Sequence, residues 1–119
     1  MSDRQILINQ AGPLPLSATI QTGSSGPSTL YVSGSVWTSE AVGKIGIAVT
    51  LDGTKVGEAV IWSNEPSEHR AVVPVFININ LDKEWPSETE PPSYTFELSA
   101  LNGATLSDLN DWFQLSFVA

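Results

Sequence analysis

Alternation of apolar and polar residues with a period of two runs through almost the whole chain, and it constrains the fold more than any other feature. In the clearest stretch, apolar residues recur at every second position from Ile45 to Leu51 and lead into Asp52 and Gly53. Asp-Gly between two alternating runs predicts a β-hairpin, because both residues tolerate a positive φ. Helical spacing is poor by comparison, so the chain is predicted to be built from strands.

Six further runs extend this pattern, and short turn-rich segments join them. They predict strands at 6–9, 14–22, 29–38, 69–81, 93–101 and 112–118. With the hairpin at 44–63, this amounts to seven or eight strands and predicts an all-β fold, an antiparallel β-sandwich of jelly-roll type. A chain of 119 residues corresponds to one domain, spanning 1–119, that can bury a core without metals or disulfides.

Two details of the pattern predict which side chains face the core. Trp62 alternates with Val56 and Val60 and is therefore expected in the core. The segment 69–81 is expected to be one long strand, with Val73 on the face of the later apolar residues and Val72 on the face of Phe76. Pro74 lies inside it and cannot donate to a ladder, which predicts an edge position or a bulge there.

Composition excludes several classes of function. The chain has no cysteine, which excludes disulfides, cysteine-ligated zinc and thiol catalysis. Its net charge is −8, and its five basic residues are dispersed, so nucleic acid is not an expected partner and anionic membranes are disfavoured. No signal peptide or membrane span is recognisable. The localisation is therefore left open between cytoplasmic, exported without a cleaved signal, and part of a phage particle.

The order of strands and turns from residue 29 to 119 resembles the C1q/TNF-like jelly roll. "TLYVSGSVWTS" resembles the aromatic-led strand of that family, "GKIGIAVTLDGTKVGEAV" its next hairpin, and "WFQLSFVA" its closing strand. The matching positions are Tyr31, Asp52, Gly53, Phe113 and Phe117. The resemblance implies a compact homotrimer that recognises a ligand at its surface, and it does not imply an enzyme.

Self-association is also expected for an independent reason, because aromatic residues lie on a face that should be exposed to solvent. Alternation places Tyr31, Trp37 and Phe76 on the outer face, with Trp112 and Tyr94 as further candidates. The outer face of a soluble monomeric sandwich is normally polar. Tyr31, Trp37, Phe76 and Trp112 are therefore predicted to form the interface of a homo-oligomer, most simply a trimer.

An acidic, proline-rich loop at 82–93 separates two of the predicted strands. It contains Trp85 together with Glu84, Glu88 and Glu90. An exposed indole flanked by carboxylates suits a glycan, whose C–H face stacks on the ring, and equally a protein interface. A third interpretation is that the ring folds back as a lid over the end of the sandwich. The four residues are predicted to bind a ligand.

Catalytic and metal motifs are lacking. His69 is the only histidine, and neither a nucleophile motif nor a zinc-protease motif accompanies it. The acids of 82–93 match no EF-hand spacing, and Asp108 and Asp111 are expected to shape the turn before the last strand. The two acidic groups should lie at opposite ends of the strand 93–101. We therefore expect no enzyme, no metal site and no cofactor.

These observations predict a non-catalytic recognition module, a homotrimeric, lectin-like sandwich that binds a glycan or a protein. The alternative is a structural or assembly protein of a phage or secretion particle. An enzyme that depends on His69 or Glu68 ranks last, because no second organised catalytic group is recognisable.

Overall fold

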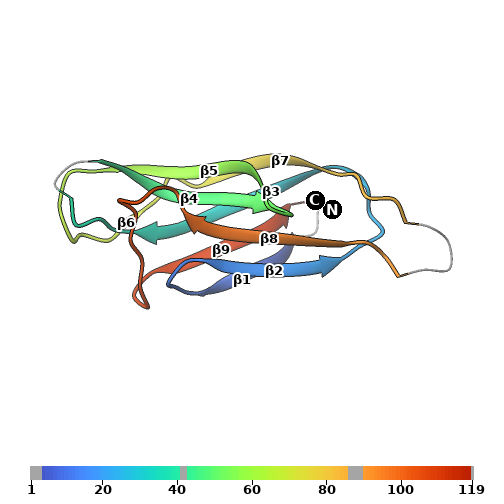
Figure 1. Ribbon diagram of the computed structural model, residues 1–119, viewed down its shortest axis with the longest axis horizontal. Helices are drawn as coiled ribbons and strands as arrows, with labels where there is room; N and C mark the ends of the chain where they lie inside the picture. Colours follow the sequence, from blue (N-terminus) through green and yellow to red (C-terminus); the bar gives the residue numbers. More distant parts are fainter. Residues whose placement is uncertain (1–3, 41–42, 86–89, 119) are drawn as a thin grey trace.

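The computed structural model describes residues 4–40, 43–85 and 90–118, and all regular structure within them is β-strand. Two antiparallel sheets pack face to face (Figure 1). No helix in these ranges is long and apolar enough to cross a bilayer. The prediction of an all-β antiparallel sandwich is confirmed.

Nine strands make up the two sheets of the described chain. They are β1 (Arg4–Ala11), β2 (Leu16–Gln21), β3 (Gly26–Val36), β4 (Gly43–Leu51), β5 (Thr54–Ser63), β6 (Arg70–Ala71), β7 (Val75–Leu81), β8 (Ser93–Ala100) and β9 (Trp112–Val118). The first sheet has the order β1–β9–β3–β6, with β7 also paired to β3, and the second has the order β2–β8–β4–β5.

The strand pairs are nested, which is the arrangement of a jelly roll. β4 pairs with β5 at the centre of the chain, β3 with β6 and β7, β2 with β8, and β1 with β9. The innermost turn is the predicted one, since Asp52 and Gly53 have φ angles of 50° and 85°. Jelly rolls in general share this nesting, so the narrower C1q/TNF-like resemblance stays a prediction.

The core lies between the sheets and follows from the alternation of each strand. Its largest fully buried side chains include Tyr94, Phe96 and Phe113. Phe96 meets Phe117 edge to face, with ring centroids 5.4 Å apart. Tyr94, a candidate for the outer face by sequence, is therefore a core residue.

The chain between β6 and β7 departs from the single strand expected over 69–81. At this interruption Val72 donates its backbone N–H to Gly34 of β3, whereas Val73 donates to Val60 of the other sheet. The interruption reverses the expected order, because Val72 is buried and Val73 is exposed. Pro74, which has no N–H, follows directly, so the predicted disturbance is confirmed and the predicted faces of residues 72 and 73 are wrong.

The expectation that Trp62 lies in the core is also wrong. The β4–β5 register shifts between Val49 and Thr50, which pair with Gly57 and Lys55, so the intervening Val56 forms a bulge. A one-residue slip turns every following side chain to the other face. Trp62 consequently lies on the outer face of the second sheet and is 62% exposed.

The connecting loops divide between two ends of the sandwich (Figure 1). We call one the apical end; it carries residues 22–25, 52–53, 82–85 and 90–92. The other, the basal end, carries residues 12–15, 37–40, 64–69 and 101–111. The acids that follow β7 and those that precede β9 therefore lie at opposite ends, as predicted.

Truncation of one inward and one outward aromatic residue tests this assignment of faces. Phe96→Ala should lower the free energy of unfolding by about 3–5 kcal/mol, because it leaves a cavity in the core. Trp62→Ala should cost about 1 kcal/mol or less, because that side chain is 62% exposed. Urea denaturation of both variants measures the difference, and equal losses would contradict the arrangement.

Candidate functional site

Residues 82–85, which follow β7 and which we call the apical loop, are attached to the sandwich through Lys83. Its backbone N–H donates to the hydroxyl of Tyr94 at 3.0 Å. Its ammonium lies 2.9 Å from the carboxylate of Asp52, bonds the carbonyl of Ser93, and sits 4.9 Å from the centroid of the Tyr94 ring. These contacts hold the first part of the loop against the β4–β5 turn and β8.

Asp52 supports the same region from the turn. Its backbone N–H donates to the Thr95 carbonyl at 2.8 Å, and its Oδ1 accepts from the Thr95 N–H at 2.9 Å. Desolvation raises the pKa of Asp52, but the Thr95 hydrogen bond and the Lys83 ammonium together outweigh it and leave the pKa below its ordinary value. The turn, β8 and the apical loop thus form one connected platform.

Trp85 lies against the loop between β2 and β3. A Cβ added to Gly23 would stand 2.1 Å from a ring carbon of Trp85, so the indole packs on backbone that only a glycine leaves open. Trp85 nevertheless remains 52% exposed. The ring therefore covers the β2–β3 loop, as the lid interpretation requires, and still presents aromatic surface to a partner.

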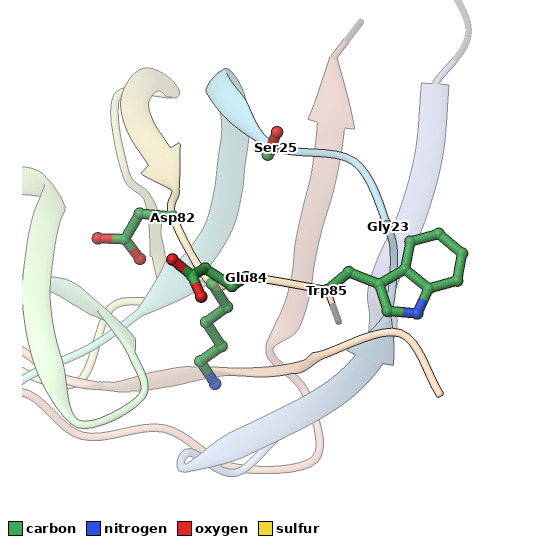
Figure 2. A pocket seen from close by; sticks show the side chains of 6 residues that line it. Gly23, Ser25, Asp82, Glu84 and Trp85 are labelled. Carbon is green, nitrogen blue, oxygen red and sulfur yellow. The ribbon is translucent and has the colours of Figure 1, made fainter. Parts of the chain in front are cut away.

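An open depression of about 670 Å³ adjoins this tryptophan. It is lined by Gly23, Ser25, Asp82, Lys83, Glu84 and Trp85. In Figure 2 the indole lies at Gly23, while Asp82 and Glu84 occupy the opposite side of the depression. An aromatic ring, a hydroxyl and two carboxylates around one hollow can stack on and hydrogen-bond a hydroxylated ligand, whereas the Lys83 ammonium is already bonded to Asp52 and Ser93.

The three predicted ligand-binding glutamates have different positions. Glu84 lines the depression beside Trp85. Glu90 is exposed and accepts a hydrogen bond from Gln21 of β2 at 3.3 Å, and it does not line the depression. Glu88 lies outside the described residues. The structure therefore brings Glu84 and Trp85 together and links Glu90 to the neighbouring strand.

The first sheet carries an apolar row across its outer face. The register aligns Ile6 of β1 with Ser116 of β9, Ser116 with Tyr31 of β3, and Tyr31 with Phe76 of β7. The rings of Tyr31 and Phe76 are 5.2 Å apart. Phe76 and Ile6 are 67% and 55% exposed, whereas Ser116 between them is fully buried. We call this set of four residues the outer row.

The other two residues of the predicted interface, both tryptophans, flank this row. Trp112, at the start of β9, is exposed and donates from Nε1 to the Asn9 amide oxygen at 2.6 Å. Trp37 directly follows β3, is half-buried, and lies 5.7 Å from the ring of His69. Tyr31, Phe76 and Trp112 thus lie on one sheet face as predicted, and Trp37 marks its basal margin.

A buried carboxylate organises the basal end below Trp37. Asp111 is fully buried, and its Oδ1 accepts from the hydroxyl of Ser35 and from His69 Nδ1, both at 2.7 Å. Its Oδ2 accepts from the Asp108 N–H at 2.9 Å. The Asp111 hydrogen bond raises the pKa of His69, burial opposes it, and the charges of Asp111 and Asp108 add to the rise.

Asp108 completes this basal cluster. Its Oδ1 accepts the Asn110 N–H at 2.8 Å, which confirms the predicted turn-forming role. Its Oδ2 lies 3.8 Å from His69 Nε2. One ligand atom from each of His69, Asp108 and Asp111 can be chosen so that all three lie within 4.8 Å of one another.

Sequence reasoning missed two residues and one contact for identifiable reasons. Ile6 joins the outer row only because the strand register pairs it with Ser116 of β9. Gly23 contributes because it has no side chain, which leaves room for the indole of Trp85. The contact of His69 with Asp111 spans 42 positions, and no local pattern joins them. Only Gly23 could have been found from the sequence, because a glycine in a turn-rich segment permits the close approach of another side chain.

In comparisons with known proteins, no family model matches the chain, and no curated protein matches it. Its function is therefore inferred from the geometry of these surfaces.

Stability should depend on pH through His69. Because the pKa of His69 is raised on folding, its stabilising effect is fully present below the ordinary value of 6.5 and is lost as the pH rises through the folded value. The effect should be below about 1 kcal/mol, because the imidazole is one-third exposed. Urea denaturation in chelator should show that the free energy of unfolding falls between pH 5.5 and 8.5 by less in His69→Gln than in the wild type. An equal fall in both proteins would contradict this role of His69.

Proposed function

We propose that this protein is a non-catalytic assembly and recognition module whose copies associate through the outer face of the first sheet. The observation that carries the proposal is the distribution of charge. The strands β3, β7 and β9 contain no charged residue, and β1 and β6 add only Arg4 and Arg70, so the strands of this sheet carry no acid although the chain has a net charge of −8. A face without acids on an acidic protein is where like-charged copies can approach with least repulsion.

The outer row supplies the favourable part of this association. Phe76 and Ile6 lie at its ends, and each exposes more than half of its surface to water. Burying large apolar side chains contributes about 1.5–3 kcal/mol each, and aromatic residues are enriched at such interfaces. Trp112 extends the same face along β9. We propose a homotrimer, the oligomer that the C1q/TNF-like resemblance implies.

The geometry of the basal cluster favours a non-catalytic role. A serine nucleophile requires a hydroxyl that donates to a histidine base. Here the hydroxyl of Ser35 donates to Asp111. The Nδ1 of His69 is bonded to the same carboxylate. The three side chains therefore converge on a buried acid and do not form a relay from nucleophile to base.

A second function, recognition of a glycan or protein, is favoured by the apical depression. The indole of Trp85 packs on Gly23, and Lys83, two residues earlier, is held by Tyr94 and Asp52. Such support reduces the conformational entropy that is lost when a ligand binds. The carboxylates of Asp82 and Glu84 offer acceptors for ligand hydroxyls. The alternative role, assembly into a phage or secretion particle, would use the outer face against a different protein.

Solution mass should distinguish the two outer faces. The protein should elute with about three times the chain mass of 12.7 kDa in light scattering after size-exclusion chromatography. Phe76→Ser should reduce this to the chain mass, because it interrupts the outer row. Trp62→Ser is the matched control, since Trp62 is an equally exposed aromatic on the opposite sheet and should leave the mass unchanged.

A wild-type monomer would contradict self-assembly through this face. Equal dissociation of both variants would show that exposed aromatic surface in general, and not this row, holds the copies together. A monomer that co-assembles with a larger particle would favour the alternative role.

Binding to an array of immobilised mono- and oligosaccharides should depend on Trp85. Trp85→Ala should weaken binding by at least about tenfold, because it removes the stacking surface. Trp62→Ala should bind as the wild type does, and circular dichroism should show both variants folded. Binding that survives Trp85→Ala would exclude the depression as the glycan site.

A further inference from the structure

The basal cluster holds its imidazole in one defined state. Asp111 receives hydrogens from Ser35 and from the Asp108 backbone, and as a carboxylate it can only accept. Its contact with His69 Nδ1 at 2.7 Å therefore requires the proton on Nδ1. When the imidazole is neutral, its Nε2 then carries a lone pair, which is the form that binds metals.

A second carboxylate faces that nitrogen. The Oδ1 of Asp108 is occupied by the Asn110 N–H, and its Oδ2 lies 3.8 Å from His69 Nε2. Both atoms belong to partly exposed side chains, 34% for His69 and 41% for Asp108. They are therefore open to an ion from solvent, and small side-chain rotations can adjust their separation.

The ring of Trp37 restricts the imidazole from a further direction. The two ring centroids are 5.7 Å apart, with planes inclined by 34°. His69 is thus oriented by a hydrogen bond at Nδ1 and by an aromatic neighbour along its face. A histidine that is bonded to a carboxylate through one nitrogen and open at the other is the arrangement that orients metal-ligating histidines in proteins.

We propose that the basal end binds a divalent transition-metal ion, of which Zn²⁺ fits best, through His69 Nε2 and Asp108 Oδ2. Tetrahedral ligands at about 2.0–2.2 Å from zinc stand about 3.4 Å apart, a few tenths of an ångström less than the separation here. Asp111 is the positioning residue that fixes the imidazole, and water completes the coordination. Calcium and magnesium prefer sites made of oxygens alone, which disfavours them at this imidazole.

This inference is independent of the proposed assembly and recognition function. The cluster belongs to loops of the basal end and the depression at Trp85 to loops of the apical end, and these two groups of loops lie at opposite ends of the sandwich in Figure 1. A variant that fails to assemble, such as Phe76→Ser, should therefore bind the ion as the wild type does. If the protein does not assemble, ion binding can still be measured, and if it binds no ion, assembly can still be measured.

Calorimetric titration of metal-free protein with ZnCl₂ at pH 7.5 tests the site. One ion per chain should bind, and His69→Gln should abolish the saturable signal, since the chain has no other histidine. Asp108→Asn should lower the affinity at least about tenfold while keeping an oxygen for the Asn110 turn. Glu65→Gln, an exposed acid of the same end outside the cluster, should leave the affinity unchanged.

A spectroscopic measurement separates coordination from a structural role. In metal-free protein at pH 8.5, ¹⁵N NMR of the single imidazole should show the proton on Nδ1, and Zn²⁺ should shift the Nε2 resonance. Saturable binding that survives His69→Gln, the absence of binding at millimolar Zn²⁺, or a proton on Nε2 would each overturn the proposal. An unchanged affinity in Asp108→Asn would overturn the ligand assignment.

Discussion

The alternation of side chains along each strand decides which apolar residues this protein buries and which it presents to other molecules. Because the period is two, a single extra residue reverses every side chain that follows it. The bulge at Val56 turns Trp62 outward, and the interruption before Pro74 sends Val72 inward and Val73 outward. β7 then resumes a regular register with β3, and that register brings Phe76 beside Tyr31. The outer row therefore depends on an unbroken pairing of β3 with β7 and β9.

The same property explains what could be predicted from the sequence. Long regular runs predicted the strands and the jelly-roll type of sandwich, and Asp52-Gly53 predicted the central turn. Tyr31, Phe76 and Trp112 were placed on one face, because β3, β7 and β9 have uninterrupted registers with one another. Trp62 was misplaced, because a bulge depends on the pairing of two strands and leaves no mark in the alternation of either.

The basal cluster lay beyond prediction for a different reason. Asp111 was expected to act locally, and one part of that expectation holds, since its carboxylate accepts the Asp108 N–H. Its bonds to Ser35 and His69 join three separate segments, and they exist because the nested pairing brings the end of β3 next to the loops before β6 and β9. A contact set by topology can be found only once the order of strands is known.

Charge and shape together connect the two proposed functions. Acids are absent from the strands of the first sheet and lie mainly in loops at both ends, where Asp82 and Glu84 adjoin the depression. A cyclic trimer about an axis along the strands would place three such depressions at one pole, since cyclic symmetry gives every copy the same direction. A single open depression with one half-exposed indole offers limited contact area. Three of them on one rigid body raise the effective concentration for a multivalent ligand, so assembly through the acid-free first sheet would strengthen recognition at the apical end without adding a contact there.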